Sequence, residues 1–392
     1  MREGWTYKKL GEVATFVTDG DWIESKDQSD EGIRLIQTGN VGNGYFKLKE
    51  DKPHFISEDT MSRLRCTEIF EGDCLVSRLP DPVGRACIIP NVGCRMITAV
   101  DCTIIRFGNN YLPQFFVYFS QSLKYQNSIN NSTTGTTRKR ISRKNLEEIS
   151  IPVPPLSEQE RIVSELDLLS GIIEKKKAQL KEYDKLAQSI FYDMFGDPVI
   201  NEKGWEVKML GDEFDVSSGG TPSTKNIEYW KDGKISWIGS NMCQNKIIYE
   251  NDGKYITNEG LEHSSAKLYT KGFVLIALVG ATIGKVALLG FETTTNQNIA
   301  GVDVPSNKEY KSIFVFYLIQ SLYCFFENIG DGKFKMANLS FVRSLPIVKP
   351  PLPLQQTFAS KIEAIERQKA LIQQSITETE TLFNSRMDYY FD

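Results

Sequence analysis

The sequence of 392 residues predicts an α+β fold: two similar mixed α/β domains joined by two long helices that form an antiparallel coiled coil. Two observations predict this fold, namely an internal duplication and a heptad-like apolar pattern after a proline pair in each half. The repeated positions are Gly4-Trp5 and Gly204-Trp205, Leu10-Gly11 and Leu210-Gly211, Gly72 and Gly272, Gly84-Arg85 and Gly284-Lys285, and Pro154-Pro155 and Pro350-Pro351.

The repeat divides the chain into two domains that alternate with two helices. We expect a first domain at 1–155, a first spacer helix at 156–197, a second domain at 198–350 and a second spacer helix at 351–392. The domains carry net charges of +1 (20 Lys and Arg against 19 Asp and Glu) and 0 (16 against 16). The helices carry −3 (6 against 9) and −2 (4 against 6), so the net charge of −4 does not exclude a nucleic-acid partner for the domains.

Each helix has apolar residues at alternating spacings of four and three, which indicates a coiled-coil seam. Lys176 and Lys369 fall on this seam, where a polar residue helps to set the register. Ser157 and Glu160 have the spacing of a capping box, and Gly196 is expected to end the first helix. The short linker favours pairing within one chain over a homodimeric coiled coil. The interface residues that we predict are Ile162, Leu166, Leu169, Ile173, Leu180, Tyr183, Ile190, Phe358, Ile362, Ile365, Ile372, Ile376 and Phe383.

Several classes of protein are disfavoured by what the sequence contains. The two histidines, His54 and His263, have no neighbour at ligand spacing, so we expect no metal site and no histidine-based triad. The apolar stretch 272–291 contains Lys285 and four glycines, and we interpret it as two buried strands rather than a membrane span. Seven cysteines without a CxxC pair, and the lack of a signal-peptide pattern, favour a cytoplasmic location.

The strongest candidate for a binding site is a basic segment at 135–144, which contains five cations and no acidic residue. Such a cluster can neutralise several phosphates, and an arginine can also read guanine. A weaker basic segment recurs in the second half, which favours a function over a solvated turn. The predicted contacts are Thr136, Thr137, Arg138, Lys139, Arg140, Arg143 and Lys144 in the first half, and Lys333, Lys335 and Asn338 in the second.

Two further sets of polar residues are candidates for DNA contacts. The first set follows apolar strands, where amide side chains can pair with adenine but can equally form ordinary turns: Gln37, Thr38, Asn40, Ser240 and Asn241. The second, weaker set flanks the repeated glycines: Ser77, Arg78, Arg85, Thr282 and Lys285. We interpret Trp22, Trp230 and Trp237 as packing aromatics rather than base-stacking ones.

This layout resembles the specificity subunit of type I restriction–modification systems over the whole chain. The resemblance implies two target-recognition domains that each read one half of a split, asymmetric DNA target. It also implies that the helices fix the distance between the halves and dock two methyltransferase subunits, with restriction subunits in systems that cleave DNA. The second helix departs from the pattern, because Pro353 and Leu354 replace Ser157 and Glu158. The segments that carry the resemblance are LGEVATFVTDGDWIESKDQ (10–28), GIRLIQTGNVGNGYF (32–46), IPVPPLSEQERI (151–162), SSGGTPSTKNIEYWKDGKISWIGSNM (217–242) and IVKPPLPLQQTF (347–358).

The chain is not expected to be an enzyme. Adenine methylation of the kind this family directs requires a [DNS]PP[YFW] loop, whereas the proline pairs here read VPPL and KPPL. We therefore expect S-adenosylmethionine to bind the partner methyltransferase and no cofactor to bind this chain. Two other classes remain open: a non-catalytic coiled-coil scaffold whose globules bind proteins, and an enzyme with a site between the globules.

Overall fold

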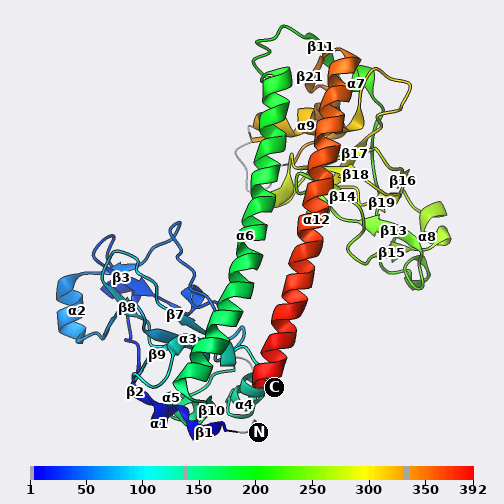
Figure 1. The fold of residues 1–392 in the computed structure, drawn as a ribbon. Coiled ribbons are helices and arrows are strands. Elements are labelled where there is room, and N and C mark those ends of the chain that lie inside the picture. Colours follow the sequence, from blue (N-terminus) through cyan, green and yellow to red (C-terminus); the bar gives the residue numbers. More distant parts are fainter. Residues whose placement is uncertain (1–3, 136–138, 328, 330–335) are drawn as a thin grey trace. The chain divides into compact units, whose positions relative to one another are not determined.

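The computed structural model describes residues 4–135, 139–327, 329 and 336–392 (Figure 1). It confirms the predicted α+β class, with mixed sheets in each half and two long helices. The chain forms two compact units, one made of 1–177 with 374–392 and the other of 178–373. Each unit therefore contains one globular domain together with a part of both long helices.

The first unit contains two four-stranded sheets and one two-stranded sheet. Neighbouring strands are antiparallel in the sheet β2-β9-β6-β7, whereas β3 and β8 are parallel in the sheet β4-β3-β8-β5. Strand β1 pairs with β10, just before the first long helix. The strands are β1 (Thr6–Lys9), β2 (Ala14–Asp19), β3 (Ile33–Ile36), β4 (Phe55–Ile56), β5 (Glu68–Ile69), β6 (Cys74–Ser77), β7 (Ala86–Ile88), β8 (Met96–Thr98), β9 (Cys102–Phe107) and β10 (Ser150–Val153).

The second unit repeats this topology and adds one strand, β14, to the sheet β12-β20-β17-β18-β14. Its other four-stranded sheet, β15-β13-β19-β16, again has one parallel pair, β13 with β19. The duplication seen in the sequence thus extends to strand order. The strands are β11 (Glu206–Met209), β12 (Val216–Ser218), β13 (Ile235–Ile238), β14 (Lys246–Ile248), β15 (Tyr255–Ile256), β16 (Leu268–Tyr269), β17 (Val274–Ala277), β18 (Val286–Leu289), β19 (Thr293–Thr295), β20 (Ile299–Val302) and β21 (Pro346–Lys349).

Short helices connect and cover these strands. In the first unit they are α1 (Leu10–Val13), α2 (Glu58–Leu64), α3 (Pro113–Phe119), α4 (Leu123–Asn131) and α5 (Arg143–Glu147), with 3₁₀ turns η1 (Ser25–Asp27) and η2 (Thr38–Asn40). In the second they are α7 (Leu210–Glu213), α8 (Asn258–Glu262), α9 (Ser312–Ser321), α10 (Tyr323–Glu327) and α11 (Leu339–Arg343), with η3 (Ile227–Tyr229), η4 (Ser240–Met242) and η5 (Gly280–Thr282).

The apolar stretch 272–291 forms a buried hairpin, as predicted. Its strands β17 and β18 are antiparallel, and all their residues are buried. Among the residues that the structure describes, no helix is both long enough and apolar enough to cross a membrane.

The two long helices, α6 (Leu156–Phe195) and α12 (Leu352–Phe391), have 40 residues each, which corresponds to about 60 Å. The predicted capping box at Ser157 is wrong, because α6 already includes that residue. Instead, the Pro155 carbonyl accepts hydrogen bonds from the N–H groups of residues 158 and 159. The Pro351 carbonyl does the same for residues 354 and 355, so both helices begin alike. Gly196 has a φ of 76° and follows the last residue of α6, as predicted.

The helices run antiparallel within each unit, where they lie side by side (Figure 1). In the first unit, Arg161 donates to the Tyr390 hydroxyl at 3.2 Å, whereas Lys177, later in α6, lies 2.9 Å from Glu380, earlier in α12. In the second unit, Asp184 lies 2.8 Å from Lys369, and the aromatic residues at the end of α6 contact Phe358 near the start of α12. Every interface residue that we predicted is buried or half-buried.

Both seam lysines have polar partners on the facing helix. The Lys176 ammonium donates to the hydroxyls of Ser375 at 2.5 Å and Thr379 at 3.3 Å. The Lys369 ammonium lies 2.8 Å from the carboxylates of Asp184 and Glu366. A half-buried cation that loses its partners costs free energy, so the contacts with Ser375, Thr379 and Asp184 on the facing helix favour this register over a shifted one.

A buried glutamine joins each long helix to the domain that precedes it. The side-chain oxygen of Gln159 accepts a hydrogen bond from the Leu112 N–H at 2.8 Å, and its amide group donates to the carbonyls of Asn110 at 3.1 Å and Pro154 at 2.9 Å. Gln355 makes the same three contacts, with Lys311 at 2.9 Å, Glu309 at 3.1 Å and Pro350 at 2.8 Å. Neither glutamine has any exposed surface.

The end of one long helix completes the core of each domain. Met387, Tyr390 and Phe391 of α12 belong to the core of the first unit, where the rings of Phe391 and Phe115 are 5.3 Å apart. The residues of α6 with the same role in the second unit include Phe195, whose ring lies 4.7 Å from that of Phe314. The start of the other helix packs into the same core in each unit.

We expect Gln355→Ala to lower the free energy of unfolding by about 3 kcal/mol, because it leaves one N–H and two carbonyls buried without their partner. Urea unfolding followed by circular dichroism measures the change. Gln356→Ala is the matched control, since Gln356 is the exposed next residue of α12 and its loss should change stability by less than about 0.5 kcal/mol. Equal effects of the two substitutions would contradict the role of Gln355.

Candidate nucleic-acid interface

The basic segment is closed at its base by a short antiparallel bridge between Thr134 and Arg140. Each residue donates its N–H to the carbonyl of the other at 2.9 Å. Three of the predicted contacts, Thr136, Thr137 and Arg138, lie outside the described residues. The four described cations, Lys139, Arg140, Arg143 and Lys144, are all exposed. This part of the first domain therefore presents positive charge at its surface.

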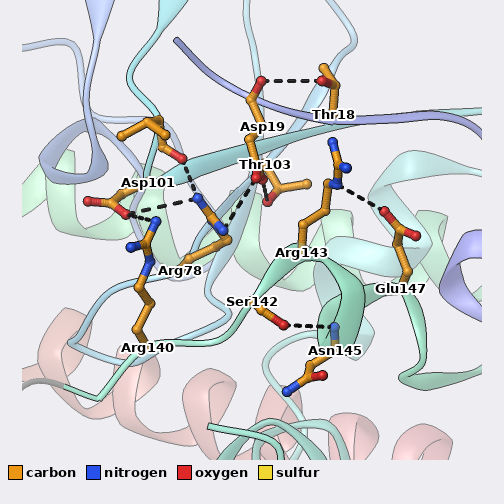
Figure 2. Close-up of polar contacts among 11 residues, drawn as sticks. Thr18, Asp19, Arg78, Asp101, Thr103, Arg140, Ser142, Arg143, Asn145 and Glu147 are labelled. Atoms are coloured by element: carbon orange, nitrogen blue, oxygen red, sulfur yellow. Dashed lines mark hydrogen bonds and ion pairs between the residues drawn. The ribbon is translucent and has the colours of Figure 1, made fainter. Parts of the chain in front are cut away.

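Arg140 belongs to a charged network with Asp101 and Arg78 (Figure 2). Its guanidinium lies 2.7 Å from the Asp101 carboxylate, which is also 4.0 Å from the guanidinium of Arg78. Arg78 lies 3.4 Å from Asp19 and donates to the Val100 carbonyl at 2.5 Å. Arg78 is only 5% exposed, and burial lowers the pKa of its guanidinium. Asp101 thus joins a buried arginine to an exposed one and fixes where the basic segment leaves the domain.

Helix α5 positions the other two cations of this segment. The Ser142 hydroxyl caps the helix by accepting a hydrogen bond from the Asn145 N–H at 3.1 Å. Arg143, on the first turn, lies 3.3 Å from Glu147 one turn later (Figure 2). Lys144 is exposed on the same turn. Arg140 and Arg143 therefore have carboxylate partners, and an anion that binds either arginine must compete with that carboxylate.

The prediction that Ser77, Arg78 and Arg85 contact DNA is corrected by their burial. Arg85 is 7% exposed, and its guanidinium donates to the carbonyls of Val41 at 2.7 Å, Leu79 at 2.7 Å and Thr38 at 2.8 Å. Burial lowers its pKa. Ser77 is fully buried and donates to the Leu79 carbonyl. These side chains hold the domain's own backbone, including the turn after β3.

The second-domain counterparts of this set are less buried. Lys285 is half-buried and donates to the side-chain oxygen of Gln244 at 3.1 Å, and the Thr282 hydroxyl lies 3.5 Å from the Val279 carbonyl. The basic residue that follows the repeated glycine is therefore buried in the first domain, as Arg85, and half-buried in the second, as Lys285.

The turn after β3 contains both a structural and a candidate binding residue. Asn40 is 7% exposed; its oxygen accepts from the Gln37 N–H at 2.9 Å, and its amide donates to the Lys47 carbonyl at 2.8 Å. The prediction that Asn40 contacts DNA is thus corrected, because both ends of the side chain shape the turn. Thr38 is half-buried, and so is Gln37, which lines a cavity of about 350 Å³.

The candidate DNA contacts of the second domain include a helix cap and two residues of a 3₁₀ turn. Asn338 is the N-cap of α11, where its oxygen accepts from the Phe341 N–H at 2.8 Å; the residue is exposed, and its contact with DNA stays a prediction. Ser240 and Asn241 begin η4 after β13; Asn241 is exposed and lies 3.4 Å from Asp252. The predicted contacts Lys333 and Lys335 lie outside the described residues.

The tryptophans differ from one another in exposure. Trp22 is 70% exposed, so its interpretation as a packing residue is wrong. The polar neighbours Asp21 and Glu24 were the sequence signal for an exposed loop at this point. Trp237 is 9% exposed and Trp230 is half-buried, and their rings meet edge to face at 5.3 Å, as expected of packing aromatics.

The known protein family with this arrangement is the type I restriction modification DNA specificity domain, whose family model matches residues 2–182 and again 202–381. The chain belongs to this family. The two matched ranges correspond to the two halves of the duplication. Family membership also confirms the prediction that the chain is a specificity subunit, the non-catalytic component of a type I system.

The chain is also similar to individual specificity subunits in sequence and in fold. The MjaIX type I restriction enzyme specificity subunit of Methanocaldococcus jannaschii is 24% identical over 393 residues, which cover 92% of this chain and 86% of that protein. The EcoR124I/EcoR124II specificity subunit of Escherichia coli is 31% identical over 187 residues, 45% of each chain. The crystal structure of the type I S subunit from M. genitalium has the same fold, with a TM-score of 0.58, 14% identity and coverage of 99% and 96%.

The exposed lysines of the basic segment generate a prediction for DNA binding by the restriction–modification complex that contains this specificity subunit. Replacing Lys139 and Lys144 together by alanine should lower the slope of log K against log salt by about two units, if each lysine neutralises one phosphate. Fluorescence anisotropy with labelled duplex at several salt concentrations measures the slope. The matched control replaces the exposed α6 residues Lys175 and Lys181 and should leave the slope unchanged. A slope that does not respond to the first pair would exclude these lysines from the interface.

Proposed function

We propose that the chain binds an asymmetric, bipartite double-stranded DNA target, with each specificity domain recognising one half. The observation that carries this proposal is a repeated scaffold with different side chains in equivalent loops. The N–H groups of Asp21 and Gly220 both bond at 2.8 Å to the carbonyl of a threonine that ends a strand, Thr98 or Thr295. These loops continue with an exposed tryptophan in one domain and with Thr221 in the other. Equal backbones with different side chains suit two different half-sites.

The proposed partners are two methyltransferase subunits, which bind S-adenosylmethionine and modify the DNA, and restriction subunits where the system also cleaves. We propose that the methyltransferases dock on the long helices, in the cytoplasm. Support comes from leucines that both helices leave exposed outside the seam, Leu168 and Leu186 on α6 and Leu371 and Leu382 on α12. Exposed apolar side chains of this size favour burial by a partner.

Methylome sequencing of a host that carries this chain and its methyltransferase tests the proposal. The expected result is a modified motif with two different specified parts separated by unspecified base pairs. A continuous palindrome would contradict the proposal.

A second expectation concerns the division of labour between subunits. The isolated chain should neither bind S-adenosylmethionine nor methylate DNA, because we assign the cofactor to the methyltransferase. Isothermal titration calorimetry with the isolated chain measures cofactor binding, and the purified methyltransferase serves as the positive control. Tight binding of the cofactor by the isolated chain would contradict this assignment.

We further propose that helix length sets the spacer between the half-sites. Inserting one heptad after Lys176 and one after Ile372 lengthens both helices by about 10 Å while keeping the seam in register. The modified motif should then have a spacer longer by up to about three base pairs, with both half-sites unchanged. The two variants that carry only one of these insertions are the controls. Each misaligns the seam between the helices and should lower the extent of DNA methylation. An unchanged spacer in the paired variant would contradict the ruler function.

A further inference from the structure

The two domains have cavities beside the same pair of strands. In the first domain β3 pairs with β4, and the Leu35 N–H donates to the His54 carbonyl at 2.8 Å. In the second domain β13 pairs with β15, and the Trp237 N–H donates to the Lys254 carbonyl at 3.0 Å. Leu35 and His54 line a cavity of about 350 Å³, and Trp237 and Lys254 line one of about 310 Å³. The two cavities therefore share these two equivalent positions, whereas their other lining residues come from different segments of the two domains.

The chemistry of the two cavities differs. The first-domain cavity is polar, because Arg34, Gln37, Lys49, Lys52 and His54 contribute to its lining. The second-domain cavity is mainly apolar, and it is lined by Thr221, Thr224, Ile227, Trp230, Trp237 and Lys254. The two domains therefore offer different chemistry beside this pair of strands, as expected where two domains recognise different groups.

The second-domain cavity offers ring surfaces and methyl groups rather than indole hydrogen-bond donors. The ring N–H of Trp237 donates to the Gly220 carbonyl at 3.1 Å, and that of Trp230 donates to the Ser223 carbonyl at 3.2 Å. Ile227, at the start of η3, is 66% exposed beside these rings. An exposed isoleucine next to two aromatic rings gains free energy when an apolar group covers it.

A positive charge lies beside the apolar surface. The Lys254 ammonium is 5.9 Å from the centre of the Trp237 ring and 3.5 Å from the Asp252 carboxylate. An apolar surface with a cation beside it complements a group that is itself apolar but belongs to an anionic polymer. In DNA the apolar group that base pairs present in the major groove is the C5-methyl of thymine, with phosphates nearby.

We propose that this cavity, with Ile227 and the two tryptophans, binds the C5-methyl group of a thymine in the half-site of the second domain. This inference rests on the proposed function as a DNA-binding specificity subunit. The proposed contact would determine specificity in the second domain alone, because the cavity of the first domain is polar and does not favour a methyl group.

The test uses the full chain in complex with its methyltransferase and a duplex that carries the motif found by methylome sequencing. Each thymine is replaced in turn by deoxyuridine, which removes only the methyl group. One replacement, in one half-site, should weaken binding about fourfold, as expected for one buried methyl group. In the variant Ile227→Ala the thymine duplex should bind more weakly, and the difference between thymine and deoxyuridine at that position should shrink.

The matched control is Ile200→Ala, which makes the same change at a residue that is 73% exposed outside the cavity. It should retain the full difference between thymine and deoxyuridine. The inference is overturned if the complex binds its motif specifically and no deoxyuridine replacement matters, or if Ile227→Ala leaves the difference intact. Absence of any motif-specific binding would instead overturn the proposed function itself.

Discussion

The arrangement of each domain on its helix depends on one buried side chain, Gln159 in the first half and Gln355 in the second. Each amide satisfies one N–H and two carbonyls that belong to three different positions of the chain. Two of these lie at the start of a domain helix, and the third belongs to the proline pair. Because buried polar groups need partners, the three groups and the glutamine hold one another in place. The direction in which each long helix leaves its domain is therefore fixed by hydrogen bonds as well as by apolar packing.

The sequence was sufficient for the fold because its signals are local or repeated. The spacing of Ile162, Leu166 and Leu169 predicts a seam without knowledge of its partner, and the proline pairs mark where the helices begin. The capping-box spacing of Ser157 and Glu160 predicts a helix start two residues after the observed one, since α6 begins at Leu156 and the Pro155 carbonyl replaces the expected serine cap. The function of Gln159 could not be read from the sequence, because its partner carbonyl at Asn110 lies 49 residues away in the chain.

The candidate site was less predictable, because the function of a charged or amide side chain depends on its burial. Arg85 and Arg140 are both arginines near glycines, yet one holds four backbone carbonyls inside the domain and the other is exposed. Asn338 has a residue type suited to base recognition but caps a helix. Conversely, Trp22 has a residue type typical of packing, although it is exposed at the surface. Hydropathy and spacing carry no information on such tertiary partners.

The composition of the two units has a consequence for when each can fold during synthesis. The second unit needs residues 178–373, which include part of α12. The first unit needs residues 374–392 as well, since Phe391 packs against Phe115 and Phe119. Although it is translated first, the N-terminal domain can bury these aromatic rings against Phe391 only after the last turn of α12 has been made. Neither domain can therefore complete its core before α12 has been translated, and apolar surface that stays exposed in an incomplete chain favours aggregation.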